Sequence, residues 1–160
     1  MLLPELHAPV LSAMLRHLSA LLLLLPWPAI AADGAALYAQ RCAVCHQTQG
    51  QGIAGHAPPL TGMEQWLATE EGRTYIARVV IHGLAGPITV RGQPYSDLML
   101  TFRWRLQDDD LVAVLRYVAE TLNEPAAGYK PISLETLSAA RAASGRDVDS
   151  LALRARLPER

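Results

Sequence analysis

The sequence predicts a small all-α domain, and two helical patterns together with the chain length support this prediction. From Glu70 to His82, apolar residues recur at the three- and four-residue spacing of an amphipathic helix. The same spacing recurs from Leu106 to Leu122, where three aspartates suit the first turn of a helix. A chain of 160 residues is long enough for one small domain with extensions at its ends.

A further helix is expected from Gly34, because Asp33 can cap its first turn. It leads into Cys42-Ala43-Val44-Cys45-His46, a C-x-x-C-H motif. Two thiols three positions apart on one helical turn point the same way, so each can add to one vinyl group of a single porphyrin. The motif therefore predicts a covalently bound c-type haem, with Cys42 and Cys45 as thioether anchors and His46 as the proximal iron ligand.

The same five residues also admit a thioredoxin-like dithiol, a disulfide or half of a zinc site. A zinc site needs further ligands, and the chain has only 2 cysteines. A thioredoxin-like motif needs a preceding strand and a βαβ pattern, and neither is visible. Aromatic residues make up only 6% of the chain, so a buried porphyrin would supply apolar area that the side chains lack.

Residues 1–31 are typical of a secretory signal. A positively charged start, the apolar run Leu21–Leu25 and the small-x-small site Ala29-Ile30-Ala31 follow in the expected order. We expect the signal proper to begin at Met14, cleavage to follow Ala31, and the product to be periplasmic with no membrane span. An uncleaved anchor is the alternative, but the apolar stretch is short for a bilayer and contains prolines.

After His46 the chain is loop-like over Gln47–Leu60, which holds three glycines and two prolines. This stretch resembles class I cytochrome c, in which a loop with a P-x-L element follows the haem histidine. In that family the proline carbonyl accepts a hydrogen bond from the histidine's other ring nitrogen and orients the ring. The resemblance implies this role for Pro58, with Pro59 as a near rival. His56 is either a distal ligand or an exposed loop histidine, and the second interpretation is favoured.

A short β-hairpin is expected around Ile88-Thr89-Val90, which is strand-like between turn residues. The stretch resembles a G-P-I-T-V-x-G-x-x-Y element found in one group of class I cytochromes, the partners or subunits of exported dehydrogenases and respiratory enzymes. In that group the axial methionine comes four residues after the tyrosine, so the resemblance implies that Met99 is the sixth iron ligand. The chain departs from the pattern at Leu100, where proline is usual, and Met63 is the rival methionine.

The candidate partners of the haem propionates, which need hydrogen-bond donors and positive charge, follow Met99 and are Arg103, Trp104 and Arg105. Surface arginines are the alternative interpretation. The family resemblance implies a domain over residues 32–123, with Tyr117 where the last helix crosses the first. Residues 124–160 form a C-terminal extension, for which we expect one helix within 131–144 and a solvated tail from Val148.

Together these features predict the class I cytochrome c fold, a small helical domain wrapped around one haem. The resemblance implies a one-electron carrier or electron-transfer subunit, not an enzyme, and its partners would be a periplasmic dehydrogenase or reductase and a terminal acceptor. The alternatives are a haem enzyme or a sensor of peroxide or gas with an open distal site, and a thiol oxidoreductase without haem. The net charge of −1 does not suggest nucleic acid as a partner.

Overall fold

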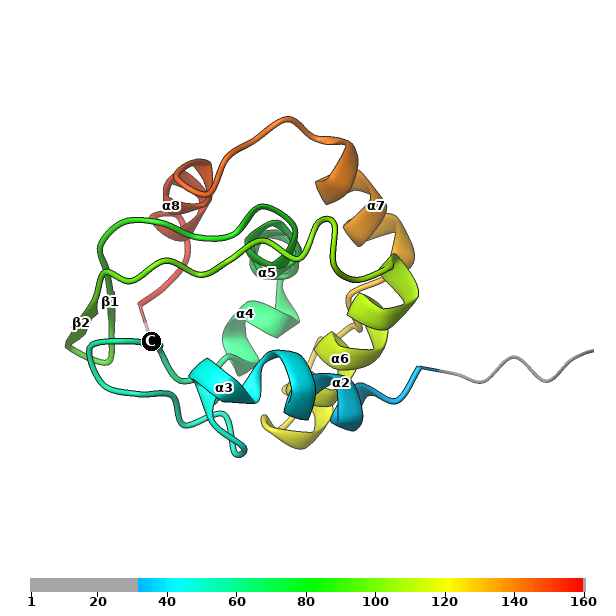
Figure 1. Ribbon diagram of the computed structural model, residues 1–160, viewed down its shortest axis with the longest axis horizontal. Helices are drawn as coiled ribbons and strands as arrows, with labels where there is room; N and C mark the ends of the chain where they lie inside the picture. Colours follow the sequence, from blue (N-terminus) through cyan, green and yellow to red (C-terminus); the bar gives the residue numbers. More distant parts are fainter. Residues whose placement is uncertain (1–31, 160) are drawn as a thin grey trace, which may run out of the picture. The chain divides into compact units, whose positions relative to one another are not determined.

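The structure is a computed structural model, and it describes residues 32–159. The secretory-signal prediction falls on residues 1–31 and so lies outside the described residues. Within residues 32–159 the secondary structure is mostly helical, with one two-stranded sheet, so the predicted all-α class is confirmed (Figure 1). No helix in this described part is both long enough and apolar enough to cross a membrane.

The first described helices carry the C-x-x-C-H motif. Helix α2 spans Gly34–Arg41, and the one-turn helix α3 spans Ala43–His46. The carboxylate of Asp33 accepts hydrogen bonds from the backbone N–H groups of Ala35 (3.0 Å) and Ala36 (3.1 Å), which is the predicted N-cap. The chain therefore enters the motif already in helical geometry.

Helix α5 (Glu70–His82) has the bounds that its apolar spacing predicts, and the short helix α4 (Glu64–Ala68) precedes it. The Thr69 hydroxyl caps α5 by accepting from the backbone N–H of Gly72 at 3.2 Å, and Gly83 ends the helix with φ of 83°. The buried face of α5 includes Tyr75, Ile76, Ala77 and Ile81.

The predicted hairpin is present as β1 (Ile88–Val90) and β2 (Gln93–Tyr95). The two strands are antiparallel, with Ile88 opposite Tyr95 and Val90 opposite Gln93. Val90 and Tyr95 are buried, whereas the turn between the strands is exposed. The hairpin thus presents one apolar side to the interior.

Helix α6 spans Asp108–Thr121, so it begins two residues later than the apolar pattern suggests. Its buried side chains are those of the predicted face, namely Leu111, Val114, Leu115, Val118 and also Ala119. Helix α2 packs against α6, and there the rings of Tyr38 and Tyr117 lie with centroids 5.2 Å apart. Tyr38 is 2% exposed, so it belongs to the core and is not a surface aromatic.

The C-terminal extension contains two helices, α7 (Leu134–Ala142) and α8 (Asp149–Arg154), and both pack against α5 (Figure 1). Our expectation of a solvated tail from Val148 was wrong. Ser150 is fully buried and its hydroxyl donates to the carbonyl oxygen of Gly83 at 3.2 Å. Polar residues in this segment find partners inside the domain, so their polarity does not place them in solvent.

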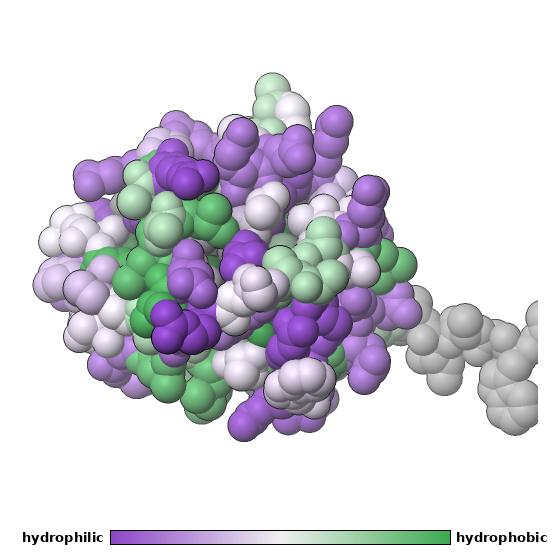
Figure 2. Space-filling model, turned by 90° about the horizontal axis from the view of Figure 1, so that it is seen from above, coloured by the Kyte–Doolittle hydropathy of each residue, from purple (hydrophilic) through white to green (hydrophobic). Residues whose placement is uncertain are grey.

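Two hydrogen-bonded contacts fasten α7 to the rest of the domain. The ring Nε2–H of His82 donates to the carbonyl oxygen of Ala140 at 2.8 Å, because a carbonyl oxygen can only accept. Arg141 donates to the carboxylate of Asp108 at the start of α6, with the closer nitrogen 2.5 Å away. On the face seen in Figure 2, apolar residues gather toward the left of the view among hydrophilic ones.

Candidate functional site

The helices and the hairpin enclose one large apolar cavity of about 420 Å³, which falls in the range usual for cofactor sites. Its wall draws on segments far apart in the sequence, from α3, the following loop, α5, the hairpin, the segment around Met99, α6 and α8. The lining residues with chemical roles are Cys42, Cys45, His46, Pro58, Met63, Trp66, Tyr75, Met99, Arg105 and Arg154.

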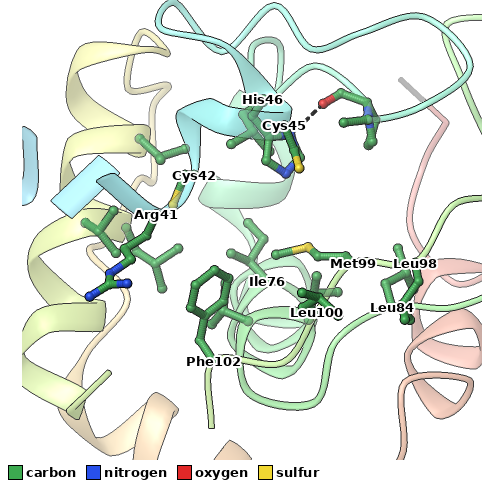
Figure 3. A pocket seen from close by; sticks show the side chains of 18 of the residues that line it. Arg41, Cys42, Cys45, His46, Ile76, Leu84, Leu98, Met99, Leu100 and Phe102 are labelled. Carbon is green, nitrogen blue, oxygen red and sulfur yellow. Dashed lines mark hydrogen bonds between the residues drawn. The ribbon is translucent and has the colours of Figure 1, made fainter. Parts of the chain in front are cut away.

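Helix α3 and its N-cap residue Cys42 place all three functional side chains of the C-x-x-C-H motif on the cavity wall (Figure 3). The backbone N–H of His46 donates to the carbonyl oxygen of Cys42 at 2.9 Å, which closes the helical turn. The two cysteines are half-buried and form no disulfide with each other. Burial, and to a lesser extent the neighbouring Cys45, raises the pKa of the Cys42 thiol from 9.0 to about 11, so it stays protonated at neutral pH.

His46 is 7% exposed, and its ring is oriented by a hydrogen bond from Nδ1–H to the carbonyl oxygen of Pro58, 2.9 Å away (Figure 3). Because the carbonyl can only accept, Nδ1 carries the proton, and in the neutral imidazole Nε2 is then the nitrogen whose lone pair can bind a metal. This is the bond that the sequence analysis assigned to Pro58 and not to its neighbour Pro59. It makes the imidazole more basic and fixes its tautomer.

Gly52 allows the loop to bring the Pro58 carbonyl to His46. Its φ is 71°, and a Cβ atom there would lie 2.3 Å from the carbonyl oxygen of Ala57 and 2.7 Å from the carbonyl carbon of Pro58. The backbone N–H of Gly52 also donates to the carbonyl oxygen of His46 at 2.9 Å. The loop therefore folds back on the histidine, and only glycine fits at this point.

Met99 lies across the cavity from His46, and its thioether points into the space between them (Figure 3). Its backbone forms an antiparallel bridge with Leu84, in which the Met99 N–H donates to Leu84 at 2.9 Å and the Leu84 N–H donates to Met99 at 3.1 Å. Two positions after Met99, the Thr101 hydroxyl donates to the carbonyl oxygen of Ile81 at 2.5 Å. The end of α5 thus holds the methionine segment in place.

The rival residues lie in other surroundings. Met63 also lines the cavity, but it is 5% exposed and its backbone N–H donates to the side-chain oxygen of Asn123 at 2.9 Å. His56 is exposed at the cavity rim and pairs with the carboxylate of Asp97, as expected for a loop histidine.

Two of the three candidates for binding propionates, Arg103 and Trp104, are not on the cavity lining. Trp104 is 84% exposed, and the guanidinium of Arg103 lies 5.2 Å from the centre of its ring. The third candidate, Arg105, does line the cavity, although it is exposed. The structure therefore brings the predicted cysteines, histidine, proline and methionine together, but leaves Arg103 and Trp104 outside.

Sequence analysis missed the polar and aromatic residues at another part of the wall. Trp66 and Tyr75 are both buried there, with ring centroids 5.4 Å apart in a T-shaped arrangement. Arg154 of α8 lies over the Trp66 ring at 4.5 Å. The aromatic residues in and before an amphipathic helix were a usable signal for this wall, whereas nothing local marked Arg154.

The donor set and the wall fit a haem. Two thiols on one turn suit thioether attachment, a neutral imidazole with a fixed tautomer suits iron, and a thioether stands opposite. The surrounding side chains are mainly aliphatic and aromatic, which suits a porphyrin face.

Comparisons with known proteins agree with this geometry. The profile of the family described as Cytochrome c matches residues 31–122. The chain is 42% identical over 132 residues to a cytochrome c-552 of Thermus thermophilus, covering 81% of this chain and 88% of that protein. A second Thermus thermophilus cytochrome c-552 is 43% identical over 114 residues, covering 69% of this chain and 86% of that protein.

A more distant similarity is to the gluconate 2-dehydrogenase cytochrome c subunit of Pantoea cypripedii, which is 31% identical over 85 residues. That match covers 53% of this chain and 19% of the subunit. The family profile spans more than half of the chain, and the first Thermus relative aligns over most of both proteins. The chain therefore belongs to the cytochrome c family: it is a class I cytochrome c, an electron carrier with covalently bound haem c and its iron, and not an enzyme.

Proposed function

We propose that this cytochrome is a periplasmic one-electron carrier, or an electron-transfer subunit, whose haem iron is held by His46 and Met99. The observation that supports this most directly is the arrangement of these two residues on opposite sides of one apolar cavity, above and below the space beside Cys42 and Cys45 (Figure 3). Two protein ligands leave no open position for a substrate, which is what an electron carrier needs.

Each residue has a distinct part in this proposal. Cys42 and Cys45 anchor the ring through thioethers, and the hydrogen bond from His46 to Pro58 orients the proximal ligand. The Met99 thioether is soft and neutral, so it favours ferrous iron and raises the potential. Haem itself supplies the one-electron chemistry, while the apolar wall excludes water and so limits the reorganisation that accompanies each electron transfer.

The proposed partners are other redox proteins, a dehydrogenase or reductase that donates electrons and a terminal acceptor. The similarity to a dehydrogenase's cytochrome subunit supports a partner of this kind. At the cavity rim, Val44, Leu98 and Leu100 line the opening yet are 74%, 57% and 55% exposed. Exposed apolar residues beside a redox centre suit brief encounters with a partner surface.

Substitution of the two methionines tests the ligand assignment. We expect the ferric protein to show a weak sulfur-to-iron band in the far red, and Met99→Ala to abolish it, lower the midpoint potential and admit carbon monoxide. Met99→His should restore six-coordination at a low potential, and Met63→Ala should retain the band. A band that survives Met99→Ala and disappears in Met63→Ala would refute the assignment.

The periplasmic location rests on the sequence of residues 1–31, with residues 32–123 as the electron-transfer domain and 124–160 as its extension. N-terminal sequencing of the protein purified from its host should find a start just after Ala31, in the periplasmic fraction. Recovery from the membrane fraction with Leu21–Leu25 still present would instead indicate an anchored protein and contradict the cleavage.

A further inference from the structure

Arg154 is a buried cation on the wall of the haem cavity. It is 9% exposed, and its guanidinium lies 4.5 Å from the centre of the Trp66 ring. One terminal nitrogen donates to the carbonyl oxygen of Thr89 at 3.1 Å. Its Nε–H is buried and has no hydrogen-bond partner. A donor in that state is costly.

The charge of Arg154 is also uncompensated. Within residues 32–159, no carboxylate forms an ion pair with it. Glu159 shares a small surface pocket with Arg154 but does not pair with it. The other two arginines on the cavity lining, Arg41 and Arg105, are exposed and so are hydrated. Burial of an unpaired guanidinium is unfavourable, and a carboxylate in the cavity would relieve it.

Haem c is the group that this family places in such a cavity, and its two propionates are carboxylates. We propose that the guanidinium of Arg154, from the C-terminal extension, binds a haem propionate. A guanidinium presents two parallel donors that match a carboxylate, and the Trp66 ring below it holds the guanidinium plane. This inference rests on haem occupying the cavity but not on Met99 being the sixth ligand.

Arg154 lies outside residues 31–122, the part that the family profile matches. Helix α8 is held against the cavity independently of the arginine, because the buried Ser150 hydroxyl bonds Gly83 and the Trp66 Nε1–H donates to the carbonyl oxygen of Pro158 at 3.0 Å. The extension therefore completes the cofactor site. It contributes a buried positive charge, whereas the other two arginines on the cavity lining are exposed.

A positive charge beside a propionate opposes the negative charge that would otherwise stabilise ferric iron. Arg154→Gln keeps a polar side chain but removes this charge, so the midpoint potential should fall. The measurement belongs at mildly alkaline pH, where the released propionate remains ionised. Arg156→Gln is the matched control, because Arg156 is exposed, two positions along the same segment, and its loss changes the net charge equally.

The second readout is the propionate bending mode in the resonance Raman spectrum of the ferrous holoprotein. Arg154→Gln should shift this mode and lower the potential, Arg154→Lys should shift the mode while keeping most of the potential, and Arg156→Gln should leave both as in the wild type. An Arg154→Gln protein with the potential and the mode of Arg156→Gln would overturn the proposal. If Arg154→Gln does not accumulate as holoprotein, Arg154→Lys decides: an unshifted mode in that variant overturns it equally.

Discussion

Gly83 and Met99 approach so closely that a Cβ atom on Gly83 would lie 2.6 Å from the carbonyl oxygen of Met99. Gly83 has φ of 83° and ψ of −175°, a conformation that is essentially restricted to glycine. The same residue ends α5, and the next residue, Leu84, forms the two-way backbone bridge with Met99. The proposed distal ligand is therefore placed by a glycine sixteen positions earlier in the chain.

Gly83→Ala should displace the Met99 backbone and weaken the proposed bond from its sulfur to iron. We expect a weaker far-red band and a lower midpoint potential than in the wild type. Gly92→Ala is the control, because Gly92 also has a positive φ of 75° but a Cβ there would meet nothing within 4 Å. Equal far-red bands in the two variants would show that the approach of Gly83 does not position Met99.

Gly52→Ala should disturb the hydrogen bond from His46 to Pro58, because the new methyl group would collide with the Ala57 and Pro58 backbone. A weaker bond makes the imidazole less basic and stabilises ferric iron less, so the midpoint potential should rise. Gly55→Ala carries the same kind of backbone strain, with φ of 73° and open space around it. Protein film voltammetry of both variants checks this, and a rise of equal size in Gly55→Ala would contradict it.

Arg141→Gln should destabilise the holoprotein by about 1.5–3 kcal/mol, the usual range for hydrogen bonds to a charged group. Arg141 contacts the Asp108 carboxylate and the carbonyl oxygens of Leu106 and Arg103, so it fastens α7 to the start of α6. Arg116→Gln removes an exposed pair with Glu120 and should change stability by less than about 0.5 kcal/mol. Denaturant titration measures both, and similar losses would refute the distinction.

Tyr38 should make stability fall with rising pH in the alkaline range. Burial is the main cause that raises the pKa of its phenol from 10.0 to about 12, while the hydroxyl donates to the carbonyl oxygen of Gln47 at 2.6 Å. Between these pH values the unfolded chain loses a proton that the folded chain keeps. The contribution is therefore complete below pH 10.0 and is lost by about pH 12.

Tyr38→Phe should remove this part of the pH dependence. The free energy of unfolding of the wild type, minus that of Tyr38→Phe, should be constant below pH 10.0 and should shrink towards pH 12. Taking the difference cancels the contributions to the free energy of unfolding from other groups that titrate in the same range. These include Tyr129, whose pKa is also raised to about 12. A difference that is independent of pH would contradict the assignment.

The parts of the fold that the sequence predicts well are those with local signals. Helix α5 combines an amphipathic period with Thr69 at its start and Gly83 at its end, and all three signals lie within the helix or beside it. Asp33 likewise caps α2 from one position away. The hairpin is bounded by turn residues at both strands. Such elements can be predicted because the residues that determine them lie close together in the sequence.

The predictions from the sequence fail where the burial of a residue depends on partners far away in the chain, or where the backbone is irregular. Ser150 and Arg154 are buried because they bond to Gly83 and Thr89, which lie 67 and 65 residues earlier. No local pattern could reveal such partners, so the segment looked like a solvated tail. Between Thr101 and Leu106 the chain follows turns and has no period, so the sequence did not show which of Arg103, Trp104 and Arg105 would reach the cavity wall.

The hydrogen bond between Trp66 and Pro158 joins residues 92 positions apart, and it has a consequence for the order of assembly. A chain leaves the ribosome from its N-terminus, so the attachment motif Cys42–His46 emerges long before α8 and the residues after it. Until those residues arrive, one side of the cavity has no covering segment. The contact between the C-terminal extension and Trp66 can therefore form only after the attachment motif and the rest of the cavity wall have been made.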